Sequence, residues 1–251
     1  MASTIEGGHA SVAIVGAGDF IGAAIARRFA AGGYLVHGGR RQGEKLDALA
    51  AEIAATGGSF TGHTLDARSE ESLVRFLDAA DASAPLAACI FNVGANVNFP
   101  LLDTTERVFR KIWEMACFAG FLTGREAARR MLVHGRGSIF FTGATASMRG
   151  GKGYAAFASA KAGLRATAQS MARELGPQNI HVAHLVIDSG VDTAWVRERM
   201  AAAHGAAAVD ALPADTLMHP ASIAEAYWQL HHQTRDAWTH ELDLRPYGEA
   251  W

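Results

Sequence analysis

The stretch SVAIVGAGDFIGAAIARRF, residues 11–29, decides the fold class. It begins with an apolar run typical of a buried strand and ends with apolar residues at helical spacing. Gly16, Gly18 and Gly22 lie where the strand gives way to the helix. Gly16 permits a tight turn, and the missing side chains let backbone N–H groups approach a pyrophosphate at the positive end of the helix macrodipole. Because the loop follows the first strand and opens the first helix, we predict a dinucleotide site here; the alternative is a plain turn with packing glycines.

The rest of the chain repeats this alternation of apolar strands and amphipathic helices. Further strands are predicted near residues 34–39, 59–67, 85–94, 137–144, 180–188 and 240–246. Helices are predicted near residues 20–32, 43–57, 70–81, 104–133, 154–175, 190–204 and 220–232. Such a pattern indicates an α/β protein: one Rossmann domain over residues 1–251, with a doubly wound parallel sheet of about seven strands and helices on both faces. We expect a loose tail over residues 1–9 and a substrate lid over residues 188–215.

Composition excludes several classes of partner. The net charge of −2 argues against a nucleic-acid or anionic-membrane partner, and no uncharged apolar run reaches the roughly 18 residues of a membrane span. Cys89 and Cys117 lie in apolar surroundings, so we expect no disulfide framework and a cytoplasmic location. The 11 histidines show no ligand spacing, and we expect no metal site.

The end of the second predicted strand, HGGRR, bears on the choice of cofactor. An NAD enzyme usually places an acidic residue here, to bind the ribose hydroxyls. Gly39 stands at that place and Arg40 follows, which suits the 2′-phosphate of NADP, with Arg41 in support. Asp66, at the end of the third strand, is placed to hydrogen-bond the adenine amino group. We therefore predict NADP as the cofactor; the alternative is that the arginines are merely solvated.

The sequence resembles the short-chain dehydrogenase/reductase superfamily over about residues 10–246. The resemblance rests on GAGDFIG (16–22), LDAR (65–68), FNVG (91–94) and FASAKAGLRATAQSMARELG (157–176). It implies a Rossmann domain, usually tetrameric, that moves hydride between NAD(P) and a carbonyl or alkene. We therefore expect a homo-oligomer, a dimer or tetramer. The cofactor contacts that the resemblance implies come from Gly16, Gly18, Phe20, Ile21, Gly22, Asn92, Gly94, Lys161 and Thr193, although Phe20 stands where the family has a glycine.

The family's catalytic positions are mostly changed in this chain. Carried over by resemblance, the Ser position is Ala144, the Tyr position is Phe157 and the Asn position is Cys117. Only Lys161 matches, and in the family this lysine binds the nicotinamide ribose. Phenylalanine cannot donate a proton and alanine cannot hydrogen-bond a carbonyl, so ordinary carbonyl reduction needs substitute groups.

Tyr154 is the candidate substitute for the missing acid. Seven residues of helix turn by about 700°, so Tyr154 and Lys161 lie within about 20° of one face if the helix extends back to Tyr154. Tyr-x6-Lys resembles the spacing in enoyl-thioester reductases, a divergent branch of the family. We therefore predict Tyr154 and Lys161 as the catalytic residues; the alternative for Tyr154 is a rim aromatic at a helix start.

These features predict an NADP(H)-dependent oxidoreductase that transfers hydride to an activated C=C bond of an enone or enoyl-type small molecule. Two alternatives stay open: a carbonyl or imine reductase with non-standard catalytic groups, and a nucleotide-binding protein without turnover. Ligands of such sheets bind outside the carboxyl ends of the strands. This rule selects the substrate residues Asn96, Asn98, Phe99, Thr145 and Met148.

Overall fold

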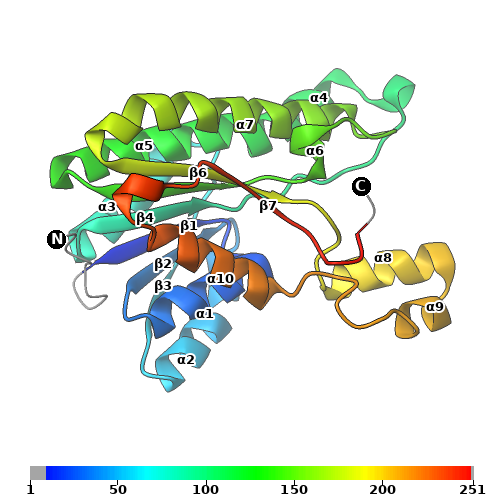
Figure 1. The fold of residues 1–251 in the computed structure, drawn as a ribbon, viewed down its shortest axis with the longest axis horizontal. Coiled ribbons are helices and arrows are strands. Elements are labelled where there is room, and N and C mark those ends of the chain that lie inside the picture. The colour runs from blue at the N-terminus through cyan, green and yellow to red at the C-terminus, as the bar shows by residue number, and fades with distance from the viewer. Residues whose placement is uncertain (1–9, 250–251) are drawn as a thin grey trace.

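Within residues 10–249 of the computed structural model, seven strands form one sheet in the order β3-β2-β1-β4-β5-β6-β7, and every neighbouring pair is parallel (Figure 1). The strands are β1 (Ser11–Val15), β2 (Leu35–Arg40), β3 (Ser59–Thr64), β4 (Leu86–Phe91), β5 (Gly137–Thr142), β6 (Ile180–Ile187) and β7 (Glu241–Leu244). The predicted doubly wound sheet is confirmed. The structure describes residues 10–249, so the tail predicted over residues 1–9 lies outside the described part.

Helices fill the connections between the strands. They are α1 (Ile21–Ala31), α2 (Asp47–Ala55), α3 (Glu70–Ser83), α4 (Glu106–Trp113), α5 (Ala119–His134), α6 (Thr145–Met148), α7 (Ala155–Leu175), α8 (Ala194–His204), α9 (Ala206–Asp210) and α10 (Pro220–His231). Short 3-10 turns lie at Gly43–Leu46, Leu101–Asp103, Gly176–Gln178 and Arg235–Ala237. The helix predicted over residues 104–133 is interrupted, because a π-helical turn at Glu114–Phe118 separates α4 from α5. Such turns often mark functional sites.

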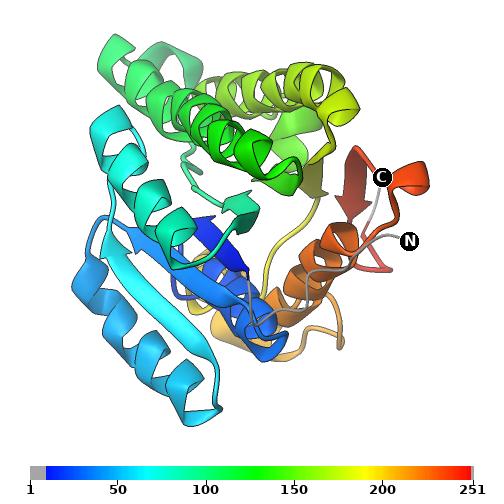
Figure 2. The ribbon, with the colours of Figure 1, turned by 90° about the vertical axis from the view of Figure 1, so that its left-hand side faces the viewer.

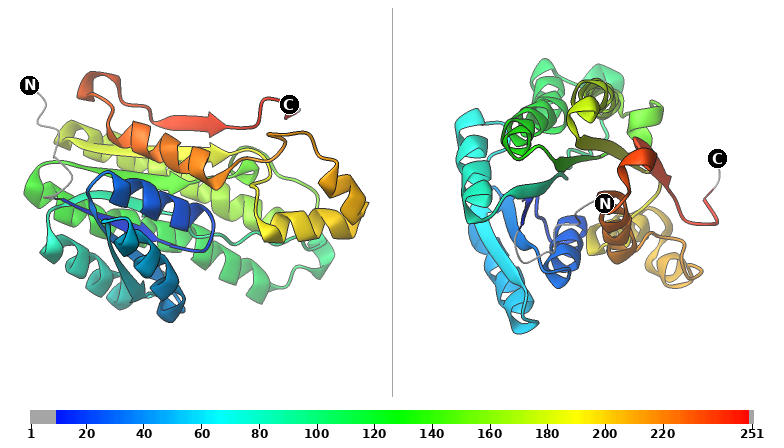
Figure 3. Two further views of the ribbon diagram at one scale, coloured as in Figure 1. Left: turned by 90° about the horizontal axis from the view of Figure 1, so that it is seen from below. Right: turned by 60° about the vertical axis from the view of Figure 1, so that its left-hand side comes forward.

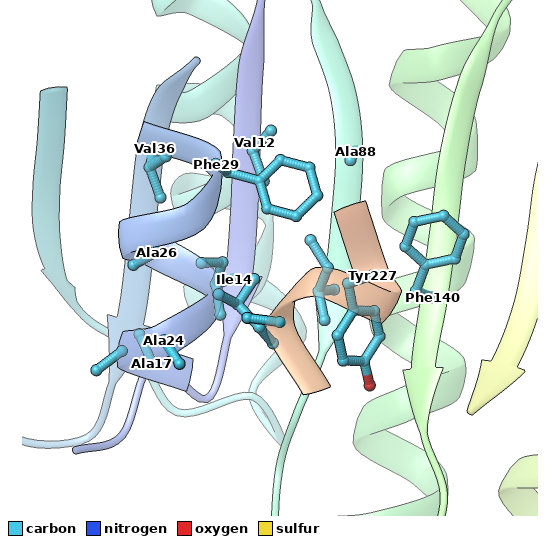
Figure 4. Packing of buried hydrophobic residues seen from close by; sticks show 14 of the residues in the cluster. Val12, Ile14, Ala17, Ala24, Ala26, Phe29, Val36, Ala88, Phe140 and Tyr227 are labelled. Atoms are coloured by element: carbon cyan, nitrogen blue, oxygen red, sulfur yellow. The ribbon is translucent and has the colours of Figure 1, made fainter. Parts of the chain in front are cut away.

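Alternate residues of β1 face opposite sides of the sheet, and each set belongs to a different hydrophobic core. Val12 and Ile14 pack with α1 and α10, which contributes the fully buried Tyr227 (Figure 4). Ala13 and Val15 pack with α3, α5 and α7 on the other face, and Figure 2 shows these two helical layers with the sheet between them. Burial on both faces explains why β1 reads as an uninterrupted apolar run.

The crevice for a ligand lies where the strand order reverses. β1 pairs with β2 on one side and with β4 on the other, so the connections that follow β1 and β4 lead to opposite faces of the sheet. Ligands of open α/β sheets bind outside the carboxyl ends of the strands at this point. α8 and α9 lie beyond that same end of the sheet (Figure 3). Within residues 10–249, no helix combines the length and apolar character needed to cross a membrane.

Three histidines, of which His37 and His184 are buried and His231 is half-buried, are expected to make the fold sensitive to acid. Burial lowers the pKa of His37 to about 4, of His184 to about 4 and of His231 to about 3, from 6.5. As the pH falls from 6.5 toward about 4, these histidines become protonated in the unfolded chain but stay neutral in the folded chain. The free energy of unfolding therefore falls by up to about 1.4 kcal/mol per pH unit for each histidine. Thermal melts between pH 7.5 and 4.5 measure this loss. His231→Gln is expected to reduce the slope, and a melting temperature independent of pH would contradict the account.

Candidate active site

The glycine loop after β1 is shaped by two close backbone approaches. Gly16 has a φ of +95°, and a Cβ there would lie 2.6 Å from the carbonyl oxygen of Asn92. A Cβ on Gly22 would lie 2.5 Å from the carbonyl oxygen of Gly16, so Gly22 lets the start of α1 approach the turn. Gly18, by contrast, has no neighbouring atom within 4 Å of its Cβ position. The first and third glycines therefore serve the fold, while the second leaves room for a ligand.

A partly buried chain of hydrogen bonds fixes the loop against the neighbouring strands. Asn92 Nδ2 donates to the Gly16 carbonyl at 3.1 Å, and Thr142 Oγ1 donates to Asn92 Oδ1 at 3.0 Å. The Thr142 hydroxyl also lies 2.7 Å from the hydroxyl of Tyr227, which comes from α10. Sequence reasoning placed Asn92 but missed Tyr227, because a contact between residues so far apart along the chain leaves no local pattern.

A first cavity of about 530 Å³ opens beside the ends of β1, β2 and β3. It is lined by predicted cofactor residues from each strand end: Gly16, Gly18, Arg40, Arg41, Asp66, Asn92 and Gly94. These positions suit the adenosine half of a dinucleotide, whose ribose would face the end of β2. Gly39 lines it too, and a Cβ there would lie 2.4 Å from a Leu65 side-chain carbon, so the strand end has no room for an acidic side chain without a shift of Leu65.

Two of the predicted polar contacts in this cavity already have partners on the chain. Arg40 Nη1 donates to Asp19 Oδ1 of the glycine loop at 2.6 Å. Asp66 accepts a bidentate pair from Arg68, at 2.9 and 2.7 Å, and this hydrogen bonding lowers the pKa of Asp66. Both charged groups are thus held in place beside the cavity, and a ligand would share them with these partners.

A second cavity of about 440 Å³ continues from the glycine loop toward α7 and α8. The predicted cofactor residues in its lining are Gly16, Gly18, Phe20, Ile21, Gly22, Asn92, Gly94, Lys161 and Thr193. Phe157 and Ala144 line it as well, at the positions where a family member would carry Tyr and Ser. The two cavities share Gly16, Gly18, Asn92, Val93 and Gly94, so together they can take one extended ligand across the strand ends.

Lys161 lies in the wall of the second cavity and is held by backbone oxygens. Its side chain is buried, and Nζ donates to the Thr142 carbonyl at 2.8 Å and to the Val93 carbonyl at 3.4 Å. Burial lowers the pKa of Lys161 to about 8. The Phe157 ring centroid lies 6.0 Å from Nζ, so this ring takes the place of a polar partner beside the ammonium. Cys117 is also buried, which raises the pKa of its thiol and disfavours the reactive thiolate.

Tyr154 does not lie on the helix as the spacing argument required. α7 begins at Ala155, and Tyr154 is its N-cap residue with φ −109° and ψ 18°. The side chain is half-buried against Phe157, with ring centroids 6.4 Å apart, but it is not part of the second cavity's lining. Its hydroxyl accepts a hydrogen bond from Arg199 of α8 at 3.3 Å. The expected projection of Tyr154 into the same cleft as Lys161 is therefore wrong for this structure. Tyr154 lies outside the lining but against Phe157, which belongs to it, and we call this position the rim of the second cavity.

The predicted substrate residues are only partly brought together. Asn96 lines the second cavity, whereas the other four do not. Asn98 Nδ2 donates to the carbonyl of Lys152 at 3.0 Å, so its amide holds the loop before α7 instead. Phe99 and Met148 are largely exposed, and Thr145 begins α6. The rule about strand ends names loops but cannot say which way each side chain turns.

Residues 10–204 match the short chain dehydrogenase family. The chain belongs to this family. The crystal structure of a short-chain dehydrogenase from Rhodopseudomonas palustris shares 59% sequence identity, with a TM-score of 0.81 over 95% of this chain and 99% of that chain. The 3-oxoacyl-[acyl-carrier-protein] reductase MabA of Mycobacterium tuberculosis is 28% identical over 218 residues, which are 85% of this chain and 82% of that protein.

A third relative of this short-chain dehydrogenase is matched over a smaller part of its length. The NADPH-dependent 1-acyldihydroxyacetone phosphate reductase of Saccharomyces cerevisiae is 27% identical over 183 residues, which are 72% of this chain and 60% of the yeast protein. The chain thus spans less than two thirds of the yeast reductase.

This short-chain dehydrogenase also contains a buried carboxylate that the sequence left unexplained. Asp188, directly after β6, is 2% exposed and pairs with Arg245 at 2.9 Å and with Arg149 at 3.3 Å. The charge is therefore compensated by the segments after β7 and α6, and the contact ties the loop before α8 to the sheet. Only the fold brings these three residues together.

Proposed function

We propose that the protein is an NADP(H)-dependent oxidoreductase that transfers hydride to a C=C bond conjugated to a carbonyl group. The observation that carries this proposal is the second cavity, where Phe157 and Ala144 lie beside Lys161. A carbonyl reductase needs a proton donor beside the oxygen bonded to the carbon that receives the hydride, because an alkoxide forms on that oxygen. In an enone the hydride goes to the β-carbon and the negative charge develops on a more distant oxygen. An apolar wall beside the hydride acceptor suits that reaction.

The nicotinamide cofactor supplies the hydride when it is bound, and the chain's own residues hold and orient it. The first cavity would hold the adenosine half, with Arg40 and Arg41 beside the ribose, and the second would hold the nicotinamide half. Lys161 is the lysine that the family uses at the nicotinamide ribose, and Thr193 lines the same cavity. The yeast relative is described as NADPH-dependent, which supports the choice of NADP.

Arg40→Gln tests the choice of cofactor. The substitution removes the guanidinium that we assign to the 2′-phosphate while keeping a polar, uncharged side chain at this position. NADPH affinity is expected to fall by about 10-fold or more, since a charge-assisted hydrogen bond contributes about 1.5–3 kcal/mol, and NADH affinity is expected to change little. Titration of both nucleotides by fluorescence gives the two dissociation constants. An equal loss for NADPH and NADH would contradict the assignment.

The proposed acid for the reaction is the Tyr154 hydroxyl at the rim of the second cavity. From there it would donate its proton to the carbonyl oxygen on which the negative charge develops, and the enol so formed would tautomerise to the saturated ketone while the phenolate regains a proton from solvent. The side chain of Trp195, from α8, lines the cavity and brings that helix over its mouth. No side chain of α8 is buried, which supports a lid that can move over residues 188–215.

Tyr154→Phe tests this role. The variant keeps the ring and its packing on Phe157 but loses the hydroxyl, so kcat with an enone is expected to fall by about 10²-fold, the usual scale for one lost donor at a developing oxyanion. NADPH affinity and melting temperature are the controls, and both should stay close to those of the wild type. Unchanged kcat in Tyr154→Phe would remove Tyr154 from the mechanism.

A second candidate is carbonyl or imine reduction, favoured by the names of the relatives. MabA is described as a 3-oxoacyl reductase and the yeast protein as a 1-acyldihydroxyacetone phosphate reductase. A third candidate is nucleotide binding without turnover, since the cofactor residues alone do not require a reaction. A panel of enones, enoyl thioesters, ketones and cyclic imines, followed by the loss of NADPH absorbance, separates the three. Preference for the alkenes supports the leading proposal, and turnover of ketones alone would overturn it.

We further propose that the protein works as a homo-oligomer in the cytoplasm. Phe109, Trp113 and Phe121 are exposed to 39%, 41% and 38% along α4 and α5, and a second copy of the chain would cover such aromatic side chains. Both cysteines are free and buried, as suits a reducing compartment. Sedimentation velocity at micromolar concentration tests whether the protein is a homo-oligomer, and a monomer would contradict that proposal.

A further inference from the structure

We propose that Tyr154 and Arg199 form a subsite for a substrate carboxylate that lies next to the activating carbonyl group. This inference rests on the proposed function, reduction of a C=C bond conjugated to a carbonyl, and names the class of compound. The substrate would be an unsaturated 2-oxo acid, in which the carbonyl oxygen and the carboxylate are neighbours on adjacent carbons.

Arg199 is placed for a ligand rather than for an ion pair within the chain. Its contacts in the described residues are the Tyr154 hydroxyl, 3.3 Å from Nη2, and the Trp195 ring, whose centroid lies 5.4 Å from Cζ. Arg197 on the same helix is already paired with Asp192 at 2.5 Å. Within residues 10–249, Arg199 forms no ion pair with a carboxylate, so its charge is available to a ligand.

The two groups offer donors that converge on one place. A guanidinium carries five N–H donors and accepts nothing, and a phenol that accepts one of them keeps its own proton to donate. With the phenol oxygen and Nη2 only 3.3 Å apart, the remaining donors serve neighbouring acceptors on a single ligand. A carboxylate beside a keto oxygen supplies acceptors at that spacing: the phenol would donate to the keto oxygen, and the guanidinium to the carboxylate.

The position of the pair connects it to the second cavity. Trp195 and Phe157 both line the cavity, and they contact Arg199 and Tyr154 respectively. The pair therefore joins the lid helix α8 to the start of α7 across the rim. The acidic residue in the cavity lining is Asp19, which is already paired with Arg40, so a bound carboxylate would face no unpaired like charge there. The apolar lining beyond the rim suits an aryl or alkyl chain on the alkene.

The test compares an acid with a ketone of the same shape. The acid is 2-oxo-4-phenylbut-3-enoate, and the ketone is 4-phenylbut-3-en-2-one, in which a methyl group replaces the carboxylate. With the wild-type protein and NADPH, kcat/KM for the acid is expected to exceed that for the ketone by about 10-fold or more, as one charge-assisted contact predicts.

Arg199→Gln is expected to bring this ratio of kcat/KM values close to one. Arg197→Gln removes the same charge from the same helix and should keep the ratio. A preference for the acid that survives in Arg199→Gln, or one that is absent in the wild type, would overturn the subsite.

Binding distinguishes a failure of the subsite from a failure of the proposed function. If neither compound is reduced, the proposed function fails, and the subsite is tested with the saturated acid 2-oxo-4-phenylbutanoate. Quenching of tryptophan fluorescence reports its binding, and Trp195→Phe assigns the signal to the cavity mouth. Affinity for the acid is expected to be about 10-fold weaker in Arg199→Gln than in the wild type. Equal affinity in the two proteins would overturn the subsite on its own.

Discussion

Gly16→Ala is expected to abolish detectable NADPH binding and to lower the free energy of unfolding by about 2–5 kcal/mol. Two effects combine at this position. The φ of +95° is a conformation that residues with a side chain rarely adopt, and the new methyl carbon would meet the Asn92 carbonyl oxygen at 2.6 Å. The obstacle is backbone at the end of β4, which cannot move without disturbing the sheet. Urea unfolding and NADPH titration measure the two losses.

Two other glycines serve as matched controls for this substitution. Gly57→Ala introduces a methyl group at a φ of +79° with no neighbour within 4 Å, so it carries the conformational cost alone, about 1–2 kcal/mol, and leaves NADPH affinity intact. Gly18→Ala has open space and lines both cavities, so it should keep stability while weakening NADPH binding. If the losses of stability and NADPH affinity in Gly16→Ala match those of either control, the close approach between the loop and the end of β4 does not limit position 16.

Lys161→Met is expected to lower kcat/KM with NADPH and an enone by about 10²-fold or more. Lys161 is the one cationic side chain among the described residues that line the second cavity, and its ammonium is held by the carbonyls of Thr142 and Val93. Methionine fills most of the same volume but supplies neither charge nor donor. It also leaves two buried carbonyl oxygens with one donor fewer, so a loss of about 1–3 kcal/mol in stability accompanies the kinetic effect.

The kinetic and structural effects of Lys161→Met can be separated by measuring NADPH affinity at a temperature where the variant is fully folded. A lysine at the nicotinamide ribose predicts weaker NADPH binding as well as slower turnover. Because the pKa of Lys161 is lowered to about 8, wild-type activity that depends on the ammonium should also decline as the pH rises through about 8, whereas residual activity of Lys161→Met should not follow this profile. A variant that retains more than about a tenth of the activity would contradict the role of this lysine.

Local sequence patterns were sufficient to predict the sheet and the nucleotide crevice. β1 is buried on both faces, so its apolar run is continuous and its character does not depend on distant residues. The turn that follows needs Gly16 because its φ is +95° and a Cβ would meet the Asn92 backbone, so the glycine can be recognised in the sequence. Lys161 was placed by resemblance to the family's active-site helix, and it lies on α7 in the wall of the second cavity.

The candidate active site was less predictable because it depends on contacts across the fold. The spacing between Tyr154 and Lys161 suggested one shared helical face, but α7 starts one residue after Tyr154, so Tyr154 is the N-cap residue and not a helical one. No periodic pattern in the sequence fixes the first residue of a helix this closely. Likewise, nothing near Asn98 in the sequence indicates that its amide bonds the carbonyl of Lys152.

Deuteride transfer tests the central claim most directly. NADPH deuterated at C4 of the nicotinamide is incubated with the protein and an enone, and the product is examined by mass spectrometry and NMR. The account predicts a saturated ketone with one deuterium on the former β-carbon and the carbonyl group retained. Deuterium on a newly formed carbinol carbon would identify a carbonyl reductase and contradict the account.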